Sequence, residues 1–198
     1  MMTSASKLPA IISRDQLRWR LLKVVRSIRI PDCWIGAGFV RNVVWNQLHG
    51  RTVSPLSGDV DVLWFDPEQV DSSADRLIEA KLRALVPSVD WSVKNQARMH
   101  VRNGDAPYTS VVDAMRYWPE TATAVAVRIN CRDHLEVAAP FGLDDLFGLI
   151  LGPTPRFAVD KRPLYDARIQ AKGWLEMWPL LRTVQAQARI RTNGMMQP

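Results

Sequence analysis

Two aspartates, Asp59 and Asp61, stand two residues apart where a polar loop leads into the apolar run Val62-Leu63-Trp64. In a β-strand, residues i and i+2 share a face, and their α-carbons lie about 6.6 Å apart. Two carboxylates placed in this way repel each other, so one tends to bind a proton unless a cation lies between them. A hard divalent ion with oxygen ligands, Mg²⁺ or Mn²⁺, suits such a pair. The sequence therefore predicts a metal site at Asp59 and Asp61.

A turn of small residues, Gly36, Ala37 and Gly38, precedes this pair and joins a short apolar run to a segment of helical periodicity. Small residues let the backbone approach a phosphate, and the free N–H groups at a helix start favour negative charge. Arg41, in the first turn of the expected helix, adds a positive contact. A phosphate-binding turn and a metal-binding pair within one compact unit together predict a site for a nucleoside triphosphate.

Residues 34–42, followed by the Asp-Val-Asp-Val of residues 59–62, resemble the signature of the DNA-polymerase-beta-like nucleotidyltransferase superfamily. They look especially similar to a small bacterial nucleotidyltransferase-like family. The segments VKNQARMH (93–100), WPETATAVAVR (118–128) and APFGLDDLFGL (139–149) are also similar to that family, so the resemblance covers about residues 14–180.

The resemblance implies a nucleotidyltransferase fold, in which helices pack on a mixed β-sheet. It also implies transfer of a nucleoside monophosphate from an NTP to an acceptor, with Asp59 and Asp61 holding the metal ions. On the same grounds Asn42, which follows Val-Arg in the motif, is assigned to nucleotide binding.

In active members of the superfamily, a third carboxylate on the next core strand completes the second metal site. Here that strand is expected at residues 90–98, and Asp90 is its only acid. We therefore assign Asp90 as the third catalytic residue, with Asp113 and Glu120 from the following segment as alternatives.

Three further side chains of the same strand, Lys94, Asn95 and Arg98, are unusually polar for a core strand. They are predicted to line the nucleotide site. The alternative interpretation is that they form a solvated face of the sheet.

The glycine turn is also similar to the GG-x-V-R-D motif of tRNA CCA-adding enzymes and bacterial poly(A) polymerases. Ala37 replaces the first glycine of that motif and Asn42 replaces its aspartate. The chain is also too short for the RNA-holding body of those enzymes, so we do not expect it to be one of them.

Helical periodicity predicts the elements that position these residues. The first helix is expected to begin at a capping box formed by Ser13 and Gln16. Asp66 as N-cap and Pro67 at the first helical position are expected to open the helix that ends near residue 85. Two valine-rich segments, at residues 123–130 and 134–139, predict a hairpin.

The last helix is expected to begin near Pro163. Its buried face is predicted to include Leu164, Ala167, Ala171, Trp174, Leu175 and Trp178. The opposite face carries Arg162, Arg168 and Lys172, which are interpreted either as a solvated face or as contacts for a nucleic-acid acceptor.

The alternation of helices and short strands over 198 residues predicts one α/β domain that borders on α+β. We expect its core at about residues 14–150, a C-terminal helical extension at about 160–180, and a flexible tail at 184–198. The hydrophobic fraction of 47% and the charged fraction of 23% are those of a globular chain and exclude intrinsic disorder. The net charge of +6 favours anionic partners.

No apolar run approaches the roughly 18 residues of a membrane span, and the first residues do not form a secretory signal. The two cysteines, Cys33 and Cys131, lack zinc or redox spacing. We therefore expect a cytoplasmic protein that does not interact with membranes.

The function predicted from these observations is metal-dependent nucleotidyl transfer from an NTP to an RNA, a protein or a small molecule. Two alternatives stay open at this point. One is a nucleotide-binding module without catalysis, and the other is a basic nucleic-acid-binding protein with a vestigial site.

Overall fold

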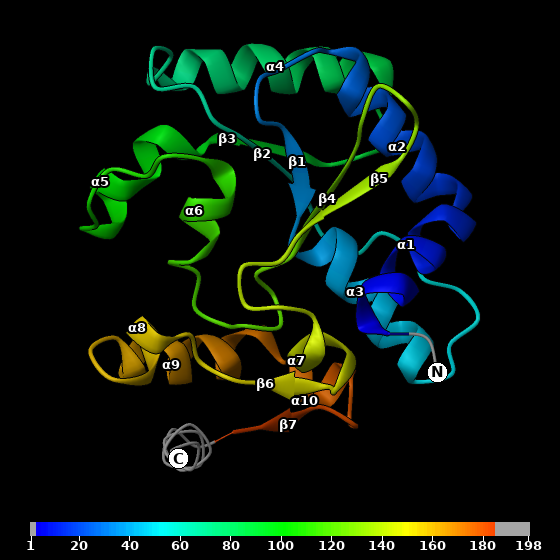
Figure 1. The fold of residues 1–198 in the computed structure, drawn as a ribbon, viewed down its shortest axis with the longest axis vertical. Helices are drawn as coiled ribbons and strands as arrows, with labels where there is room; N and C mark the ends of the chain where they lie inside the picture. The colour runs from blue at the N-terminus through cyan, green and yellow to red at the C-terminus, as the bar shows by residue number, and fades with distance from the viewer. Residues whose placement is uncertain (1–2, 185–198) are drawn as a thin grey trace, which may run out of the picture.

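A computed structural model describes residues 3–184 and arranges them around a five-stranded mixed sheet (Figure 1). The strands are β1 (Trp34–Gly36), β2 (Val60–Trp64), β3 (Trp91–Asn95), β4 (Ala126–Ile129) and β5 (Leu135–Ala138), in the spatial order β3-β2-β1-β4-β5. Within this sheet β2 and β3 run parallel, whereas the other neighbouring strands run antiparallel. The predicted mixed sheet and hairpin are confirmed.

The helices that surround the sheet are α1 (Ser4–Arg14), α2 (Gln16–Ser27), α3 (Gly38–Leu48), α4 (Ser72–Leu85), the 3₁₀ helix η1 (Gln96–Arg98), α5 (Met99–Asn103), α6 (Val111–Met115), α7 (Asp144–Phe147), α8 (Pro155–Ala158), α9 (Arg162–Lys172) and α10 (Trp174–Met177). A short parallel pair, β6 (Ile150–Leu151) with β7 (Arg182–Thr183), ties the end of the described chain to the segment after α7. In residues 3–184, no helix combines the length and the apolar character needed to cross a bilayer.

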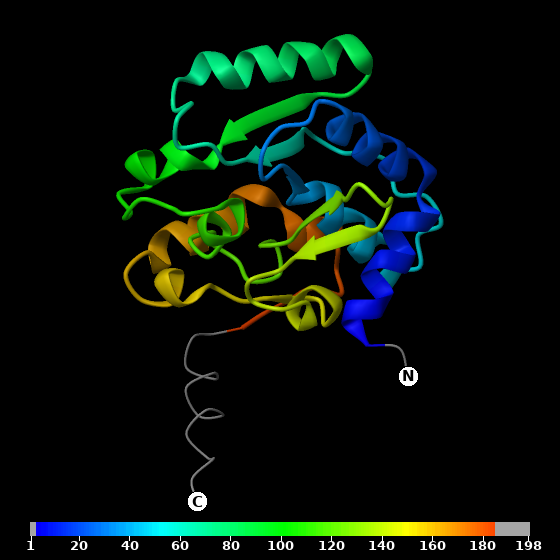
Figure 2. The same ribbon diagram turned by 45° about the horizontal axis from the view of Figure 1, so that its top comes forward.

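The two faces of the sheet are covered by different helices, because side chains alternate along each strand. Val60, Val62 and Trp64 of β2 are buried in the main core with residues of α2, α3 and α4. Leu63 points to the opposite face, where it packs with Met115 of α6 in a smaller cluster. Helix α4 and helix α6 accordingly lie on opposite sides of β3 and β2 (Figure 2).

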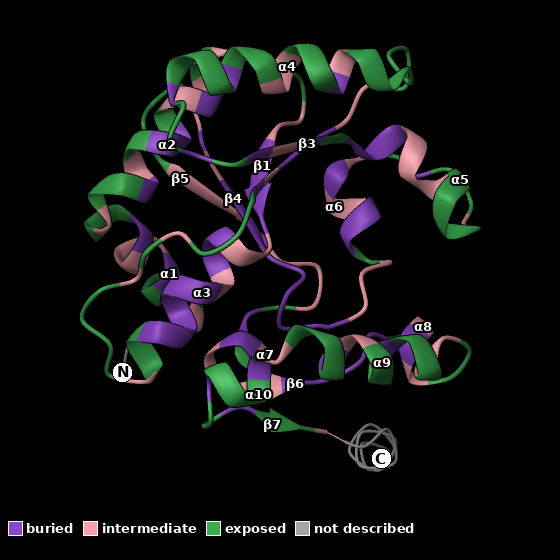
Figure 3. Cartoon of the chain, turned by 180° about the vertical axis from the view of Figure 1, so that it is seen from behind, coloured by how far each residue is buried: buried purple, intermediate pink, exposed green. Residues whose placement is uncertain are grey.

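The C-terminal segment from α8 to β7 packs against the end of the domain that carries α3 and α7 (Figure 1). Trp45 of α3 makes edge-on contacts with Trp174 and Trp178, with ring centroids 5.9 and 5.1 Å apart. The indole of Trp178 also donates a 2.8 Å hydrogen bond to Asn46 Oδ1. Helix α3 is therefore enclosed on several sides, and most of its residues are buried (Figure 3).

Two predicted helix starts are wrong, because other side chains cap the first turns. Asp15, in an extended conformation, accepts a 2.9 Å hydrogen bond from the Arg18 N–H and separates α1 from α2. Ser13 belongs to the end of α1 and bonds back to the Ala10 carbonyl. Similarly, Asp71 caps α4, whereas Asp66 closes a turn ahead of that helix.

The predicted buried face of the last helix is also partly wrong. Helix α9 ends at Lys172, because Gly173 adopts a left-handed φ of 58°. Leu164 and Leu175 are 61% and 41% exposed, whereas Tyr165 and Ile169 are buried. The helix is thus rotated relative to the prediction. Apart from Val184, the expected tail at 184–198 lies outside the described residues.

Candidate functional site

Strand β2 directs Asp61 to the face of the sheet that also carries Leu63, and Asp59 precedes the strand by one residue. The pKa of Asp61 is raised to about 6, first by burial and then by the negative charge of Asp59. The positive charges of Arg41, Lys172 and Arg168 act in the opposite direction. The structure therefore brings the two predicted metal ligands close enough for the charge of Asp59 to affect the ionisation of Asp61.

The glycine turn lies beside this pair because β1 and β2 are antiparallel neighbours. Ile35 pairs with Val62, so the end of β1 at Gly36 reaches the level of Asp61. Ala37 follows with φ 50° and ψ −118°, and its N–H donates to the Val125 carbonyl at 3.0 Å. The chain then enters α3 at Gly38, where the first N–H groups of the helix have no intrahelical acceptor.

Close packing accounts for the glycine at position 36. A β-carbon there would lie 2.8 Å from Leu63 Cδ1 and 3.4 Å from the Trp118 ring. Both contacts are shorter than, or at the limit of, ordinary van der Waals separation. Gly36 therefore allows Leu63 and Trp118 to pack closely over the end of the strand.

Arg41 projects from the first turn of α3 toward the two aspartates. Its guanidinium lies 4.5 Å from the ring centre of Trp174 and 5.4 Å from that of Trp45. The pKa of Arg41 is lowered to about 10, mainly by burial, while the charge of Glu120 acts to raise it and that of Arg168 to lower it. Arg41 is therefore still charged at neutral pH, as its predicted role in phosphate binding requires.

Asn42 is buried and does not face the same space as Arg41. Its Oδ1 accepts a 3.0 Å hydrogen bond from Arg41 Nε, and its Nδ2 donates a 2.9 Å bond to Ser57 Oγ. Asn42 thus connects the arginine to the loop that leads into Asp59. In the structure, its side chain positions Arg41 instead of lining the cleft.

A cleft of about 530 Å³ opens over Asp61 and extends to the C-terminal segment. Ala37, Arg41 and Asp61 lie on its inner side, and its outer parts come from α5, the segment after α6, α8 and α9. The aromatic part of the lining is Tyr117, Trp118 and Phe157, and the basic part is Arg41, Arg102, Lys161 and Arg168. Acidic, aromatic and basic side chains from six or more segments therefore converge on one space.

Asp90 does not complete a three-carboxylate group with Asp59 and Asp61. It is exposed just before β3, where its carbonyl accepts a 2.7 Å hydrogen bond from the Val60 N–H. Within residues 3–184, no group of three or more His, Cys, Asp or Glu side chains is arranged to hold a metal ion. Asp113, the first alternative, accepts a 3.0 Å bond from the Thr109 N–H next to α6.

Glu120, the second alternative, is completely buried beside the cleft. One carboxylate oxygen pairs with Arg168 Nε at 2.7 Å, and the other accepts a 2.6 Å hydrogen bond from Thr123 Oγ1. Its charge also acts on Arg41. Glu120 is therefore engaged with arginines and does not face the aspartate pair as a third metal ligand.

Asn95 and Arg98 do not line the cleft, contrary to the prediction. Asn95 is fully buried on the α4 side, where it accepts a 3.0 Å bond from the Ala97 N–H and donates to the carbonyls of Asp66 and Gln69. Arg98 forms an ion pair with the buried Asp75 of α4. Asn95 of β3 thus fixes the turn after β2, and Arg98 of η1 is tied to α4, whereas Lys94 is exposed on the sheet.

The basic residues of α9 are functional candidates that the sequence reasoning left undecided. Arg168 lines the cleft, and both Arg168 and Lys172 act on the ionisation of Asp61. Their spacing of four residues places them on one helix face. This spacing is visible in the sequence and indicates a shared helix face. It does not indicate whether that face points toward solvent or toward the aspartates.

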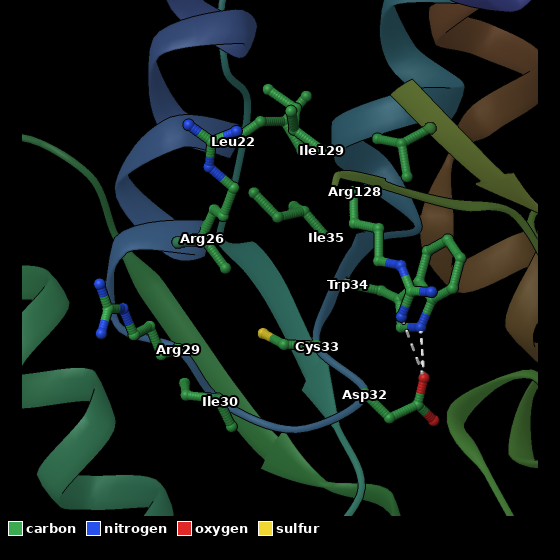
Figure 4. A pocket seen from close by; sticks show the side chains of 12 residues that line it. Leu22, Arg26, Arg29, Ile30, Asp32, Cys33, Trp34, Ile35, Arg128 and Ile129 are labelled. Carbon is green, nitrogen blue, oxygen red and sulfur yellow. Dashed lines mark hydrogen bonds and ion pairs between the residues drawn. The ribbon is translucent and has the colours of Figure 1, made fainter. Parts of the chain in front are cut away.

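A smaller cavity of about 210 Å³ lies at the other end of β1 (Figure 4). Burial raises the pKa of the Cys33 thiol to about 12, so it stays protonated at neutral pH. Arg128 stacks on Trp34, 4.1 Å from the ring centre, and pairs with Asp32 at 3.5 Å. Arg26, which also lines this cavity, pairs with Asp133. The predicted metal ligands and the glycine turn lie at the opposite end of β1.

A family model described as nucleotidyltransferase matches residues 23–183, which include both aspartates and the glycine turn. The chain belongs to this nucleotidyltransferase family. A search of curated proteins finds no match.

Among solved structures, the nucleotidyltransferase is similar to one described as an NMR structure that reveals a CCA-adding enzyme head domain. The identity is 33% and the TM-score is 0.81, over 91% of this chain and 95% of that one. It also has the fold of part of a CCA-adding enzyme in complex with CTP (15% identity, TM-score 0.59, 93% of this chain and 44% of that one). The Thermotoga maritima CCA-adding enzyme complexed with tRNA is similar to the same extent (15% identity, TM-score 0.57, 93% and 43%). The predicted nucleotidyltransferase fold is confirmed.

Proposed function

We propose that this protein transfers a nucleoside monophosphate from an NTP to an acceptor, and that Asp59 and Asp61 hold the divalent cation this reaction needs. The observation that carries the proposal is the position of Asp61. Asp61 is a partly buried carboxylate in β2, next to a second carboxylate and beside the start of helix α3. Three cationic side chains are close enough for their charges to affect its pKa. Family membership and fold support the same reaction class.

The chemistry of the aspartate pair fits Mg²⁺ or Mn²⁺. The raised pKa of Asp61 means that the ionised pair is held at a cost in free energy. A doubly charged ion with a preference for carboxylate oxygen offsets that cost. When bound, such an ion neutralises charge on the triphosphate and on the departing pyrophosphate.

The other residues of the chain bind and orient the nucleotide in this proposal. The N–H groups at the start of α3 donate to phosphate oxygens, and the turn at Ala37 lets them approach closely. Arg41, which Asn42 holds through its Nε, adds a charge-assisted contact. The open, partly aromatic mouth of the cleft leaves room for a base and an acceptor.

Two observations guide the choice of acceptor: the charge at the rim of the cleft and the ligands of solved proteins with the same fold. Arg102 and Lys161 give the rim of the cleft a positive charge that suits a polyanion such as RNA. Solved proteins of the same fold are described as complexes with CTP, with ATP and with tRNA. These nucleotides and tRNA are therefore the first substrates to test, with protein and small-molecule acceptors next.

The test is incubation with each of the four NTPs, labelled at the α-phosphate, together with Mg²⁺ or Mn²⁺ and the candidate acceptors. We expect label on one acceptor class, a loss of at least about 100-fold in Asp59→Asn and Asp61→Asn, and no loss in Asp160→Asn, which removes an exposed acid. Equal transfer by wild type and Asp61→Asn would refute the proposal. Asp90→Asn, assayed beside them, tests the sequence-based assignment of a third carboxylate.

A second candidate function is nucleotide binding without transfer. The observation that favours it is that, in the part of the chain with described structure, no third carboxylate joins the aspartate pair. This function predicts that an NTP with Mg²⁺ raises the melting temperature while no acceptor is labelled. Detection of labelled product that depends on Asp61 would exclude it.

A further inference from the structure

Two guanidinium groups from distant parts of the chain share one buried tryptophan. The guanidinium carbon of Arg41, from α3, lies 4.5 Å from the ring centre of Trp174, and that of Arg168, from α9, lies 5.5 Å from it. Trp174 is only 3% exposed, so its position is fixed by the surrounding core. Both arginines line the cleft together with Asp61.

Holding two like charges near each other is unfavourable, and Arg168 accordingly lowers the pKa of Arg41. A buried carboxylate offsets this repulsion. Glu120 is completely buried, pairs with Arg168 Nε at 2.7 Å and is the strongest favourable charge acting on Arg41. The fold therefore uses a buried acid to keep two arginines together at the surface of the cleft.

Arg168 keeps the capacity to bind an anion while it is paired with Glu120. A guanidinium has five N–H donors, and this hydrogen bond uses the one on Nε. The side chain is 38% exposed, on the side of the cleft where Asp61 also lies. Arg168 can thus bind a second anion without breaking the contact that positions it.

The local charges support a polyanionic ligand that arrives with a metal ion. The cations around Asp61 are Arg41, Arg168 and Lys172, and the carboxylates are Asp59, Asp61 and Glu120, so the sum is close to zero. A divalent cation at the aspartates changes that sum to about +2. The triphosphate group of an NTP carries the opposite charge and matches the cluster.

We propose that Arg168 is the second guanidinium of the triphosphate site, acting with Arg41, and that Glu120 is the residue that positions it. This inference rests on the proposed function, since it names a further substrate contact in the same cleft. It makes helix α9 part of the nucleotide site, in addition to β2 and α3.

The experiment compares binding of a non-hydrolysable NTP analogue and of the corresponding nucleoside monophosphate, each with Mg²⁺, by isothermal titration calorimetry. Arg168→Gln is expected to bind the NTP analogue about 10- to 100-fold more weakly than wild type. Its affinity for the monophosphate should change less than about threefold, because the lost contact is to the outer phosphates. Arg162→Gln is the matched control, because Arg162 lies on the same helix but pairs with the exposed Asp166.

Glu120→Gln and Glu120→Asp test the positioning role. The glutamine variant should lose affinity for the triphosphate selectively, and the aspartate variant should recover part of it because the charge is restored. A merely structural role would weaken both ligands equally. If Arg168→Gln fails to fold because Glu120 is left unpaired, the double variant E120Q/R168Q removes both charges and should show the same selective loss.

The outcomes separate this inference from the proposed function. If wild type binds the NTP analogue and Arg168→Gln binds it equally well, the role of Arg168 is wrong while the proposed function stands. If wild type with Mg²⁺ binds no NTP analogue, both are overturned.

Discussion

Replacement of Asp61 by asparagine should stabilise the folded protein at the same time as it removes the metal site. The side chain keeps its shape in this variant, but the partly buried charge and its repulsion with Asp59 are lost. An acid whose pKa rises from 3.8 to about 6 on folding destabilises the native state by roughly 3 kcal/mol when it is ionised. For a chain of this size, that corresponds to an increase in melting temperature of roughly 6–12 °C as an upper value.

The pH dependence of this effect has a definite sign. Protonated Asp61 contributes stability that is fully present below pH 3.8 and is lost as pH rises through about 6. The asparagine side chain of the variant does not titrate and has no such dependence. The difference in melting temperature between Asp61→Asn and wild type should therefore be largest at pH 8 and should shrink toward zero near pH 4.

The assay is thermal unfolding followed by circular dichroism between pH 4 and pH 8, in the absence of divalent ions. Asp90→Asn is the control, because it removes an exposed acid at the start of the adjacent strand and should change the melting temperature little. Addition of Mg²⁺ should stabilise wild type at pH 8, much less at pH 5, and should not stabilise Asp61→Asn. A variant that is as stable as wild type, or less stable, across the whole pH range would refute this account of Asp61.

Three further predictions concern the elements around the site. Arg18→Met should lower the free energy of unfolding, measured in urea, by about 3–5 kcal/mol. The reason is that fully buried Arg18 donates to the carbonyls of Phe39 and Ser54 and pairs with Asp15. A decrease below about 1 kcal/mol would contradict this. Ala37→Gly should raise the free energy of unfolding by up to about 1 kcal/mol, because the backbone at Ala37, with φ of 50° and ψ of −118°, suits glycine. Nucleotide binding should be retained, and a lower melting temperature of the variant would count against this prediction. In the native protein, the exposed Cys131 should react with a thiol reagent at pH 8. Cys33 should react only on unfolding, because its raised pKa keeps the thiol protonated. Fast modification of both thiols would contradict the raised pKa of Cys33.

The chemistry of the site could be predicted where it depends on neighbours in the sequence. Alternation along a strand places Asp59 and Asp61 on the same side, and a strand that ends in small residues before a helical segment predicts the turn at Ala37. These are local relationships, because one or two residues of backbone geometry determine them. The hairpin was predicted for the same reason, whereas the mixed sheet was expected from the family resemblance.

Two polar residues, Asn95 at the end of β3 and Arg98 in η1, show a limit of prediction from sequence. Their sequence pattern is compatible both with a binding site and with internal hydrogen bonding. Only the packing of α4 and of the loop after β2 gives Asn95 and Arg98 their partners, Asp66 and Asp75 among them. A side chain's donors and acceptors can be read from sequence, whereas its partners depend on which segments meet in space.

The contribution of α9 was decided by tertiary structure alone. Apolar residues occur around most of this helix, so periodicity did not identify the buried side, and Leu164 is exposed while Ile169 is buried. The docking of Trp174 and Trp178 on Trp45 sets the rotation of the segment and turns Arg168 toward the cleft. Arg41, Glu120 and Arg168 thus meet through contacts between distant segments, and such contacts have no signature in the local sequence. The aspartate pair, in contrast, is specified by the sequence of a single strand and the residue before it.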